Sequence, residues 1–561
     1  MRKRGLRVLC GPEGLSLVVL FLLTLLWGRV LLQDVVIAGT PDMESAFTKV
    51  AALVQSWRDG APLGRWTPHL NFGYGYPVLN MYSPLLYYVA AGIAVLSGQI
   101  AYGLNIALLL FAFFSAVAMF FFVRRWWGAP AAFFSSVAYL FAPYRSLDVF
   151  HRGGCSESVV FLFLPLIFLC LDRFLDKPKA LSFLGIAVSM AGVVLAHNLM
   201  AMLILPVALI YAIFRSLSMK RAMARGGFSL LALFCGCFLA SYFVFPALWE
   251  MQFANAGRLL SGMGDYRGHF MSLGSILFAN GLREPYHGGG LWAVLMGASL
   301  LLSPFFLRRD RAVVPLFIFW SVLSGLCIFM MLSYSAPVWA FLKPLALVQF
   351  SWRFFLFLSF MSSFLMASLI FFVQPKVRWA LAIVGVCVVL ASHYRYTHPQ
   401  GGVYRQEIVD LKEWLYRARP MDDMEGLPRQ VQVIALEPPK RFVEVVRGEA
   451  ELIGAPVRSE LRQQFVVRAR TPAAVMLHLF YFPGWTVLVD GKEAKILSEN
   501  PWGVILFFVP PGEHHVEVSF GHTPVRWIGE GISLFFVLVL CGVWVFRKRF
   551  ESTFFTGESQ G

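Results

Sequence analysis

Most of the chain consists of apolar stretches about as long as a membrane-spanning helix, separated by short polar segments. A helix needs about 20 largely apolar residues to cross a bilayer. The pattern therefore predicts an α-helical polytopic membrane protein of about 12 spans. We expect the spans at 15–32, 102–123, 130–147, 157–171, 180–196, 199–214, 228–249, 290–307, 313–332, 354–373, 377–394 and 527–546.

Two apolar stretches do not fit a simple crossing. Residues 84–97 are short and follow Tyr82-Ser83-Pro84, so we expect an interfacial or re-entrant helix there. Residues 180–214 are too long for one crossing, and His197-Asn198 interrupts them. We expect two helices joined by a tight external hairpin, because a single broken helix would reverse the side of every later element.

Residues 395–525 have a different pattern, in which apolar and polar positions alternate. Such runs, bounded by residues that favour turns, are typical of antiparallel strands. The clearest runs are Gln464–Arg470, Val475–Tyr481 and Val504–Val509, with turns at Pro483-Gly484, Asp490-Gly491 and Pro510-Pro511-Gly512. The pattern predicts an all-β sandwich inserted before the last span.

The chain thus divides into three expected parts. A transmembrane domain covers 1–394 and includes a first external loop at 33–83. An external β-sandwich domain covers 395–525, and a last transmembrane helix with a cytoplasmic tail covers 526–561.

Composition and charge agree with a membrane protein. Hydrophobic residues make up 58% of the chain and charged residues only 14%, against about a quarter in soluble domains, which excludes a water-soluble enzyme. The net charge is +16, yet segment 395–525 holds 15 basic and 16 acidic residues. The positive excess therefore lies between the spans, which is typical of cytoplasmic loops and not of a nucleic-acid-binding surface.

The basic clusters also predict an orientation. Lys and Arg residues are enriched in loops on the cytoplasmic side of a membrane. Clusters at Arg2–Arg7, 124–125 and 547–549 then place both termini in the cytoplasm and residues 395–525 outside.

The first external loop holds the residues best suited to chemistry. Asp42 and Glu44 follow the first span, and their carboxylates are candidates for a general base and for ligands of a divalent cation such as Mg²⁺ or Mn²⁺. Cationic and aromatic side chains suited to a lipid-linked polar substrate accompany them: Lys49, Arg58, Arg65, Trp66, Tyr74 and Tyr82. Thr40 and Pro41 are equally typical of an ordinary helix start, so that alternative stays open.

Three other positions are candidates for substrate binding. Arg152 and Glu157 lie at an expected external helix end, where a structural ion pair is the alternative. His197 lies at the tip of the expected hairpin, where a polar turn is the alternative.

Several motifs together resemble a known family. They are the acidic pair after the first span, Gly60, Leu63, Arg65-Trp66, Pro68, Gly73-Tyr74-Gly75-Tyr76-Pro77, Tyr82-Ser83-Pro84-Leu85, Arg152-Gly153-Gly154 with Glu157, Gln349–Phe354 and Phe482-Pro483-Gly484-Trp485. They are similar to motifs of the GT-C superfamily of polyprenyl-phosphate-sugar glycosyltransferases. More narrowly, they resemble bacterial membrane proteins described as 6-pyruvoyl-tetrahydropterin-synthase-related, and the YfhO-like group.

The resemblance implies a GT-C-like fold and a transferase of the bacterial inner membrane. A sugar would pass from a polyprenyl-phosphate donor to an envelope glycan, lipid or protein acceptor on the external face. Asp42 would accept the proton of the attacking hydroxyl, and cations such as Arg152 and Arg353 would stabilise the leaving phosphate.

Two departures from the family pattern keep other functions open. The family often has a His shortly after the first Asp, where this chain has Met43, Glu44, Ser45 and Ala46, and Ser351 replaces the usual Pro. A non-catalytic envelope-assembly protein and a flippase for lipid-linked glycans are the alternatives.

Overall fold

The computed structural model describes residues 11–217, 219, 221–255, 261–278, 290–307, 313–418, 426–433, 435, 437–459 and 461–555. The N-terminal basic cluster Arg2–Arg7 lies outside the described residues, as does the end of the expected cytoplasmic tail.

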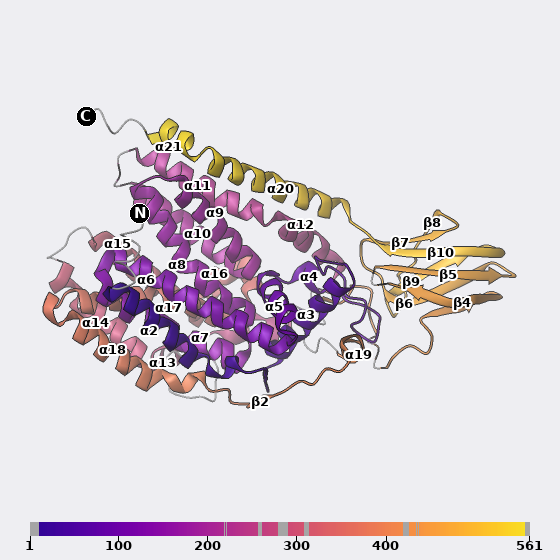
Figure 1. Ribbon diagram of the computed structural model, residues 1–561, viewed down its shortest axis with the longest axis horizontal. Helices are drawn as coiled ribbons and strands as arrows, with labels where there is room; N and C mark the ends of the chain where they lie inside the picture. The colour runs from indigo at the N-terminus through magenta and orange to yellow at the C-terminus, as the bar shows by residue number, and fades with distance from the viewer. Residues whose placement is uncertain are drawn as a thin grey trace.

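A body of helices carries a β-sandwich at one end, as Figure 1 shows. The helices are α2 (Pro12–Trp27), α3 (Pro41–Arg58), α4 (Val78–Met81), α5 (Leu85–Ser97), α6 (Ile100–Leu140), α7 (Pro143–Leu147), α8 (Cys155–Asp176), α9 (Ala180–Ala196), α10 (Asn198–Ser216), α11 (Ala222–Leu239), α12 (Ser241–Glu250), α13 (Leu273–Phe278), α14 (Gly290–Leu307), α15 (Val314–Met331), α16 (Ala336–Phe341), α17 (Phe354–Phe371), α18 (Arg378–His393), α19 (Leu411–Arg417), α20 (Pro524–Val545) and α21 (Arg547–Phe555).

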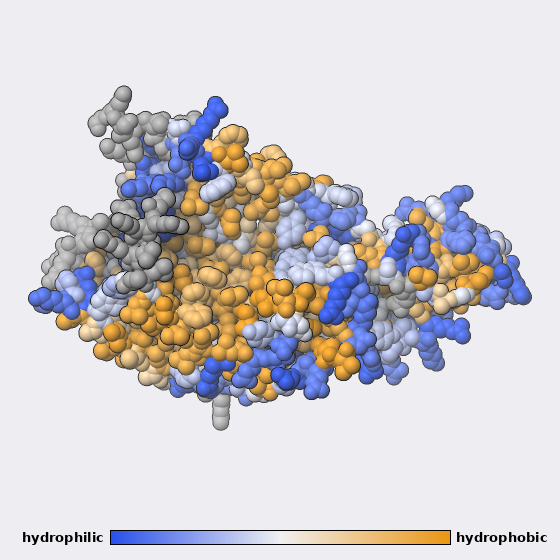
Figure 2. Space-filling model, viewed as in Figure 1, coloured by the Kyte–Doolittle hydropathy of each residue, from blue (hydrophilic) through white to orange (hydrophobic). Residues whose placement is uncertain are grey.

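The helical body has the surface of a membrane protein. Eight of the described helices are long and apolar enough to cross a membrane, and four shorter apolar helices accompany them. Figure 2 shows a broad hydrophobic belt over this body, with hydrophilic surface at both of its ends. A belt of this width suits the interior of a bilayer and not water. The expected polytopic membrane fold is thus confirmed, whereas the count of 12 spans stays a prediction.

The longest helix, α6, consists of two antiparallel arms that meet at Gly128. This residue has φ 79° and ψ 174°, which interrupts the helix. Contacts along α17 reveal the reversal: the pairs are Phe122–Phe360, Trp127–Phe371, Ser135–Ser363 and Tyr144–Phe355. The first arm runs along α17 in the same direction and the second runs back. The expected break between 102–123 and 130–147 is therefore confirmed.

Two other expected boundaries have different outcomes. The break at His197 is confirmed, because α9 ends at Ala196 and α10 begins at Asn198. The span expected at 228–249 is interrupted at Ala240, because α11 ends at Leu239 and α12 follows as a separate helix. Side chains of other segments satisfy the backbone groups that this break leaves unpaired. The N–H of Tyr242 donates to Ser533 in α20, and its carbonyl, which Pro246 cannot pair, accepts from Arg65.

Residues 84–97 form the short helix α5, as expected. Its 13 residues reach about 20 Å at 1.5 Å per residue, less than the roughly 30 Å of a bilayer core. The helix packs closely on the start of α6, where a Cβ on Gly103 would lie 2.5 Å from the carbonyl oxygen of Ala90.

Basic residues gather at one end of the helical body. Arg124 pairs with Glu13 at 2.6 Å, and Arg215 pairs with Asp172 at 3.1 Å. The second pair joins the ends of α8 and α10, which confirms that α9 and α10 form a hairpin. The cytoplasmic location of this end stays a prediction.

The β-sandwich consists of two antiparallel sheets. The strands are β3 (Val443–Arg447), β4 (Ala450–Arg458), β5 (Arg462–Ala469), β6 (Ala473–Phe480), β7 (Trp485–Val489), β8 (Lys492–Ala494), β9 (Val504–Val509) and β10 (Gly512–Phe520). The sheet orders are β4-β5-β10-β7-β8 and β3-β6-β9. Asp490 and Gly491 both have positive φ in the β7–β8 turn, which suits a tight hairpin. The expected β-domain before the last helix is confirmed.

The first external loop lies between the helical body and the β-sandwich. A short ladder pairs β1 (Val36–Ile37) with β2 (Val403–Tyr404). The backbone N–H of Phe480 in β6 donates to the carbonyl of Tyr74 at 2.8 Å. Residues 395–442, which we expect to belong to the β-domain, precede its strands, and their helix α19 packs on α3. The boundary at 395 stays a prediction.

A buried ion pair fastens this loop, the helical body and the β-sandwich to one another. Arg526 in α20 donates to Glu250 in α12 at 2.9 Å, and both side chains are only 1% exposed. Arg526 also donates to the carbonyl of Pro483 in the β6–β7 turn, at 2.9 Å. The carboxylate of Glu250 also accepts hydrogen bonds from Nδ2 of Asn80 in the loop, at 2.6 Å, and from Oγ1 of Thr523, at 2.7 Å. A single carboxylate thus joins three parts of the chain.

Replacing Arg526 by Met would leave Glu250 as an uncompensated buried charge. Breaking a buried pair from one side costs about 3–5 kcal/mol, so we expect a clearly lower melting temperature for the protein in detergent. Arg462→Met is the matched control, because Arg462 pairs with Glu517 at the surface with 56% of its side chain exposed. An exposed pair contributes about 0–1 kcal/mol. Equal losses in the two variants would show that the Glu250 pair does not fasten the parts.

Candidate functional site

The start of α3 packs against a glycine turn that follows Arg152. Gly153 has φ 83°, and a Cβ there would lie 2.4 Å from the backbone N of Met43. A Cβ on Gly154 would lie 2.2 Å from Oδ1 of Asp148. Real Cβ atoms are not found at such distances, so only two glycines let these segments approach one another. The close approach places Asp42 beside Arg152.

Arg152 is the centre of a cluster of three carboxylates. Its Nε lies 3.3 Å from Oδ2 of Asp42. Its Nη1 lies 2.9 Å from Oδ1 of Asp148 and 3.0 Å from Oε2 of Glu157. A guanidinium carries five N–H donors in a rigid plane, so it can serve several acceptors at once. The structure therefore brings Asp42 to Arg152 and Glu157, which lie more than 100 residues later in the sequence.

A second arginine completes the cluster. Nε of Arg353 lies 3.2 Å from Oε2 of Glu157, and its Nη1 donates to the carbonyl of Val348 at 2.7 Å. The hydroxyl of Tyr144 donates to Oε1 of Glu157 at 2.5 Å. The ring centroid of Phe350 lies 5.0 Å from Arg353 and 5.8 Å from Arg152. Both oxygens of Glu157 are thus paired inside the protein.

Asp42 is the member of this cluster that contacts water. Its side chain is 46% exposed, against 11% for Arg152 and 0–6% for Asp148, Glu157 and Arg353. Arg152 links this exposed carboxylate to the buried carboxylates of Asp148 and Glu157. The carboxylate of Asp42 is thus held beside Arg152 and remains accessible at the surface of the cluster.

Two further side chains expected from the sequence lie near this cluster. Lys49 follows Asp42 by seven residues, or two helical turns, so it lies on the same face of α3. Its Nζ lies 3.9 Å from the ring centroid of Tyr82 and donates to Ser45 at 2.6 Å. His197 caps α10 by accepting from the N–H of Met200. Burial and the charge of Arg353 lower the pKa of His197 to about 3, so it is neutral at neutral pH.

Asp42 and Glu44 do not form a pair of metal ligands. Side chains two positions apart on a helix point about 200° away from each other. Asp42 faces Arg152, whereas Glu44 lies near Tyr404, whose pKa burial and the charge of Glu44 raise. The described part of the chain has no group of three or more His, Cys, Asp or Glu suited to a metal. The donor set thus does not fit a shared divalent cation, and we derive no step through one.

Four other residues expected to bind substrate lie elsewhere. Arg58 ends α3, about 24 Å along the helix from Asp42 at 1.5 Å per residue. Arg65 pairs with Glu530 in α20 at 3.0 Å. Trp66 is fully buried, and Tyr74 is 4% exposed and packs on Phe480. Their positions fasten the loop to α20 and to the β-sandwich, and the structure does not bring them to Asp42.

Sequence reasoning missed two members of the cluster. Asp148 directly follows the expected span 130–147. Its side chain is buried and forms an ion pair with Arg152. A carboxylate at the edge of an apolar span is a usable signal, because such groups are rare and paired. Tyr144 carries no comparable signal, since its bond to Glu157 joins elements that only the fold brings together.

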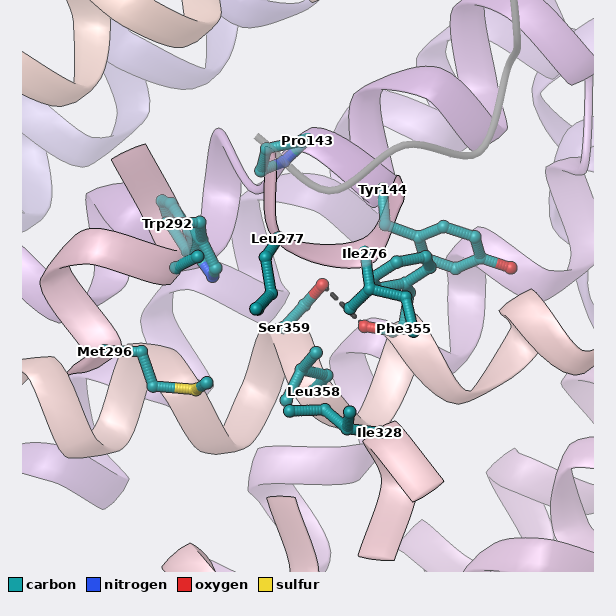
Figure 3. A pocket seen from close by; sticks show the side chains of 11 residues that line it. Pro143, Tyr144, Ile276, Leu277, Trp292, Met296, Ile328, Phe355, Leu358 and Ser359 are labelled. Carbon is teal, nitrogen blue, oxygen red and sulfur yellow. Dashed lines mark hydrogen bonds between the residues drawn. The ribbon is translucent and has the colours of Figure 1, made fainter. Parts of the chain in front are cut away.

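An apolar cavity adjoins the cluster on the side of Tyr144 (Figure 3). Its walls include Tyr144, Trp292, Met296, Phe355 and Leu358. The hydroxyl of Tyr144 points away from the cavity and toward the site of Glu157. The cavity measures about 30 Å³, enough for one or two water-sized molecules. It does not house a lipid chain in this conformation.

Replacing Gly153 by Ala tests whether the glycine turn positions Asp42. The added methyl group would collide with the start of α3 and force a strained φ, which costs about 1–3 kcal/mol from the backbone alone. We expect a lower melting temperature in detergent. Gly227→Ala is the control, because a Cβ there meets nothing within 4 Å. If Gly153→Ala were as stable as Gly227→Ala, the close packing of α3 on this turn would be wrong.

A family model for a membrane protein domain, described as 6-pyruvoyl-tetrahydropterin synthase related, matches residues 79–397. An uncharacterized protein of Lactococcus lactis subsp. cremoris is 23% identical over 221 residues, which cover 38% of this chain and 36% of that protein. The match thus spans about a third of the length of the relative.

Solved structures of three membrane proteins are similar at a low level. The arabinofuranosyltransferase AftD from Mycobacteria has a TM-score of 0.41 at 15% identity, covering 70% of this chain and 27% of that one. The Archaeoglobus fulgidus oligosaccharyltransferase has a TM-score of 0.45 at 14% identity, and the match covers 74% of this chain and 58% of that one. ArnT from Cupriavidus metallidurans, bound to undecaprenyl phosphate, has a TM-score of 0.39 at 18% identity. The match covers 68% of this chain and 64% of that one.

Because all three TM-scores are below 0.5, these structures do not decide what this chain does. The family match, in contrast, covers more than half of the chain and includes Arg152, Glu157, His197 and Arg353. The chain belongs to the family of membrane proteins described as 6-pyruvoyl-tetrahydropterin synthase related.

Proposed function

We propose that this protein is a membrane glycosyltransferase of GT-C type. It transfers a sugar from a polyprenyl-phosphate donor to the hydroxyl of a glycan, lipid or protein acceptor on the external face of a bacterial inner membrane. One observation carries the proposal: a half-exposed carboxylate, Asp42, lies at the start of the second helix, 3.3 Å from the largely buried Arg152. The motif resemblance of the first external loop and of the segments around Arg152 and Arg353 supports the same class.

In the proposed reaction, Asp42 is the general base. The acceptor oxygen attacks the anomeric carbon, and Asp42 takes the proton of that hydroxyl. One carbon–oxygen bond forms as the bond between the anomeric carbon and the phosphate oxygen breaks, so the leaving electron pair goes to polyprenyl phosphate. The base must be within reach of the acceptor hydroxyl, and the exposure of Asp42, the highest in the cluster, supports this role.

Arg152 is placed to stabilise the leaving phosphate. Its Nε and Nη1 bind the three carboxylates, and within the described residues its Nη2 has no hydrogen-bond partner. Because the side chain is 11% exposed, a phosphate oxygen can approach that nitrogen from the surface. A preorganised cation in a partly buried site stabilises developing negative charge without reorganisation. Asp148 and Glu157 are positioning residues, since they fix the plane of this guanidinium.

Asp42→Asn tests the role of the base. The amide keeps the size of the side chain but cannot take a proton, and general-base catalysis contributes about 10²–10⁴-fold. We expect sugar release from a panel of polyprenyl-phosphate sugars to fall by that factor, with protein purified in detergent and assayed with Mg²⁺, with Mn²⁺ and with EDTA.

Glu44→Gln is the matched control, because Glu44 lies on the same helix turn and faces away from Arg152. It should retain activity. Turnover that survives in Asp42→Asn would refute the general base. Folded wild-type protein that releases sugar from no donor, but moves a lipid-linked glycan across liposomes, would favour the flippase alternative.

A further inference from the structure

A polar cleft lies between the first external loop, α19 and the β-sandwich, and none of the cluster around Arg152 lines it. Its volume is about 470 Å³, within the range of about 300–1,000 Å³ typical of small-ligand sites. The side chains that line it include Asp59, His69, Lys412, Tyr416 and Gln463. Three separate parts of the chain therefore contribute to one recess.

The wall formed by the loop and α19 is held in a fixed arrangement. Asp59 accepts from Gln55 and Lys412, both at 2.8 Å, and lies 3.2 Å from Nε2 of His69. Partial burial would raise the pKa of Asp59, but the hydrogen bonds from Lys412, Gln55 and His69 lower it below its ordinary value. The carboxylate is thus ionised at neutral pH and balances the charge of Lys412. The cleft consequently has no excess charge from this pair.

The opposite wall contains an acceptor without a donor. Gln463 in β5 is 1% exposed, and its Nε2 donates to the carbonyl of Ser459 at 2.7 Å. Within the described residues its Oε1 has no hydrogen-bond partner. Leaving a buried acceptor unsatisfied costs about 1–3 kcal/mol, so a ligand hydroxyl would be favoured there once a small rearrangement opens this shielded oxygen to the cleft. Lys412, with 52% of its side chain exposed, offers further N–H donors on the other wall.

The donors and acceptors of the cleft match a neutral, polyhydroxylated ligand. A phosphate would require an excess of positive charge, and a metal ion an excess of carboxylates, whereas Asp59 and Lys412 balance. Tyr416 adds an aromatic ring, held edge-on by Phe72 with 6.2 Å between centroids. An amide acceptor, an ammonium donor and an aromatic ring around one polar recess suit the hydroxyls and the C–H face of a sugar.

We propose that this cleft binds a neutral saccharide. The proposal stands on the cleft itself. That the saccharide is part of the acceptor of the transferase is a further step, which rests on the proposed function.

The test is direct binding to the full-length protein in detergent. The probes are methyl glucoside, methyl galactoside, methyl mannoside and maltose, whose binding is followed by saturation-transfer NMR. Inorganic phosphate and Mg²⁺ are the charged alternatives, and their binding is followed by isothermal titration calorimetry. We expect saturable binding of at least one sugar, weakened tenfold or more in Gln463→Leu and in Lys412→Met. Gln464→Leu is the matched control, because Gln464 lies next along β5 on the exposed face of the strand. It should bind as the wild type does.

Melting temperatures in the same detergent separate lost binding from lost folding. Lys412 is largely exposed, so Lys412→Met should stay folded even if the buried Gln463→Leu does not. Asp42→Asn should bind the sugar normally, so failure of the transferase function leaves this result intact. Binding of no sugar, equal binding in Lys412→Met and the wild type, or preference for phosphate would each overturn the proposal.

Discussion

The ion pairs of Arg152 are the interaction on which the candidate site depends. One guanidinium bonds to carboxylates from α3, from the segment before the glycine turn and from α8. Such a cation is costly to bury unless it is fully paired. Its ion pair with Asp42 joins the first external loop to the helical body. Asp42 owes its position to that ion pair and to the glycine turn, and 46% of its side chain remains exposed.

The same loop also joins the β-sandwich to the membrane helices. Asn80 contacts the buried pair of Glu250 and Arg526, and Tyr74 bonds to β6. The loop is thus a structural joint and a chemical surface at once. This double role explains why Arg65 and Trp66, which have the chemistry of substrate-binding residues, are used for packing instead.

The sequence predicts the parts of this architecture that depend on local pattern. Apolar length identifies the membrane helices, and alternation with Asp490-Gly491 turns identifies the strands. The helix break after Leu239 could not be predicted, because its unpaired backbone groups are satisfied by Ser533 and Arg65 from distant segments. Local patterns contain no information about such partners.

Some residues of the candidate site could be predicted from the sequence, and others could not. Asp42, Arg152, Glu157 and Arg353 follow from motifs, and the fold brings them together. The pairing of Asp42 with Glu44 as metal ligands was not supported, because helical geometry turns the two side chains apart. The cleft has no signature in the sequence, since Asp59 and Gln463, which line it together, are 404 residues apart.

The central claim is that the exposed Asp42, held by Arg152 beside two buried carboxylates, faces external water as the proposed function requires. The most direct test replaces the native cysteines, introduces Asp42→Cys or Arg124→Cys, and labels intact cells with a membrane-impermeant maleimide. The account predicts rapid labelling at position 42, and labelling at position 124 only after the cells are permeabilised. Labelling at position 42 that also requires permeabilisation would contradict the account.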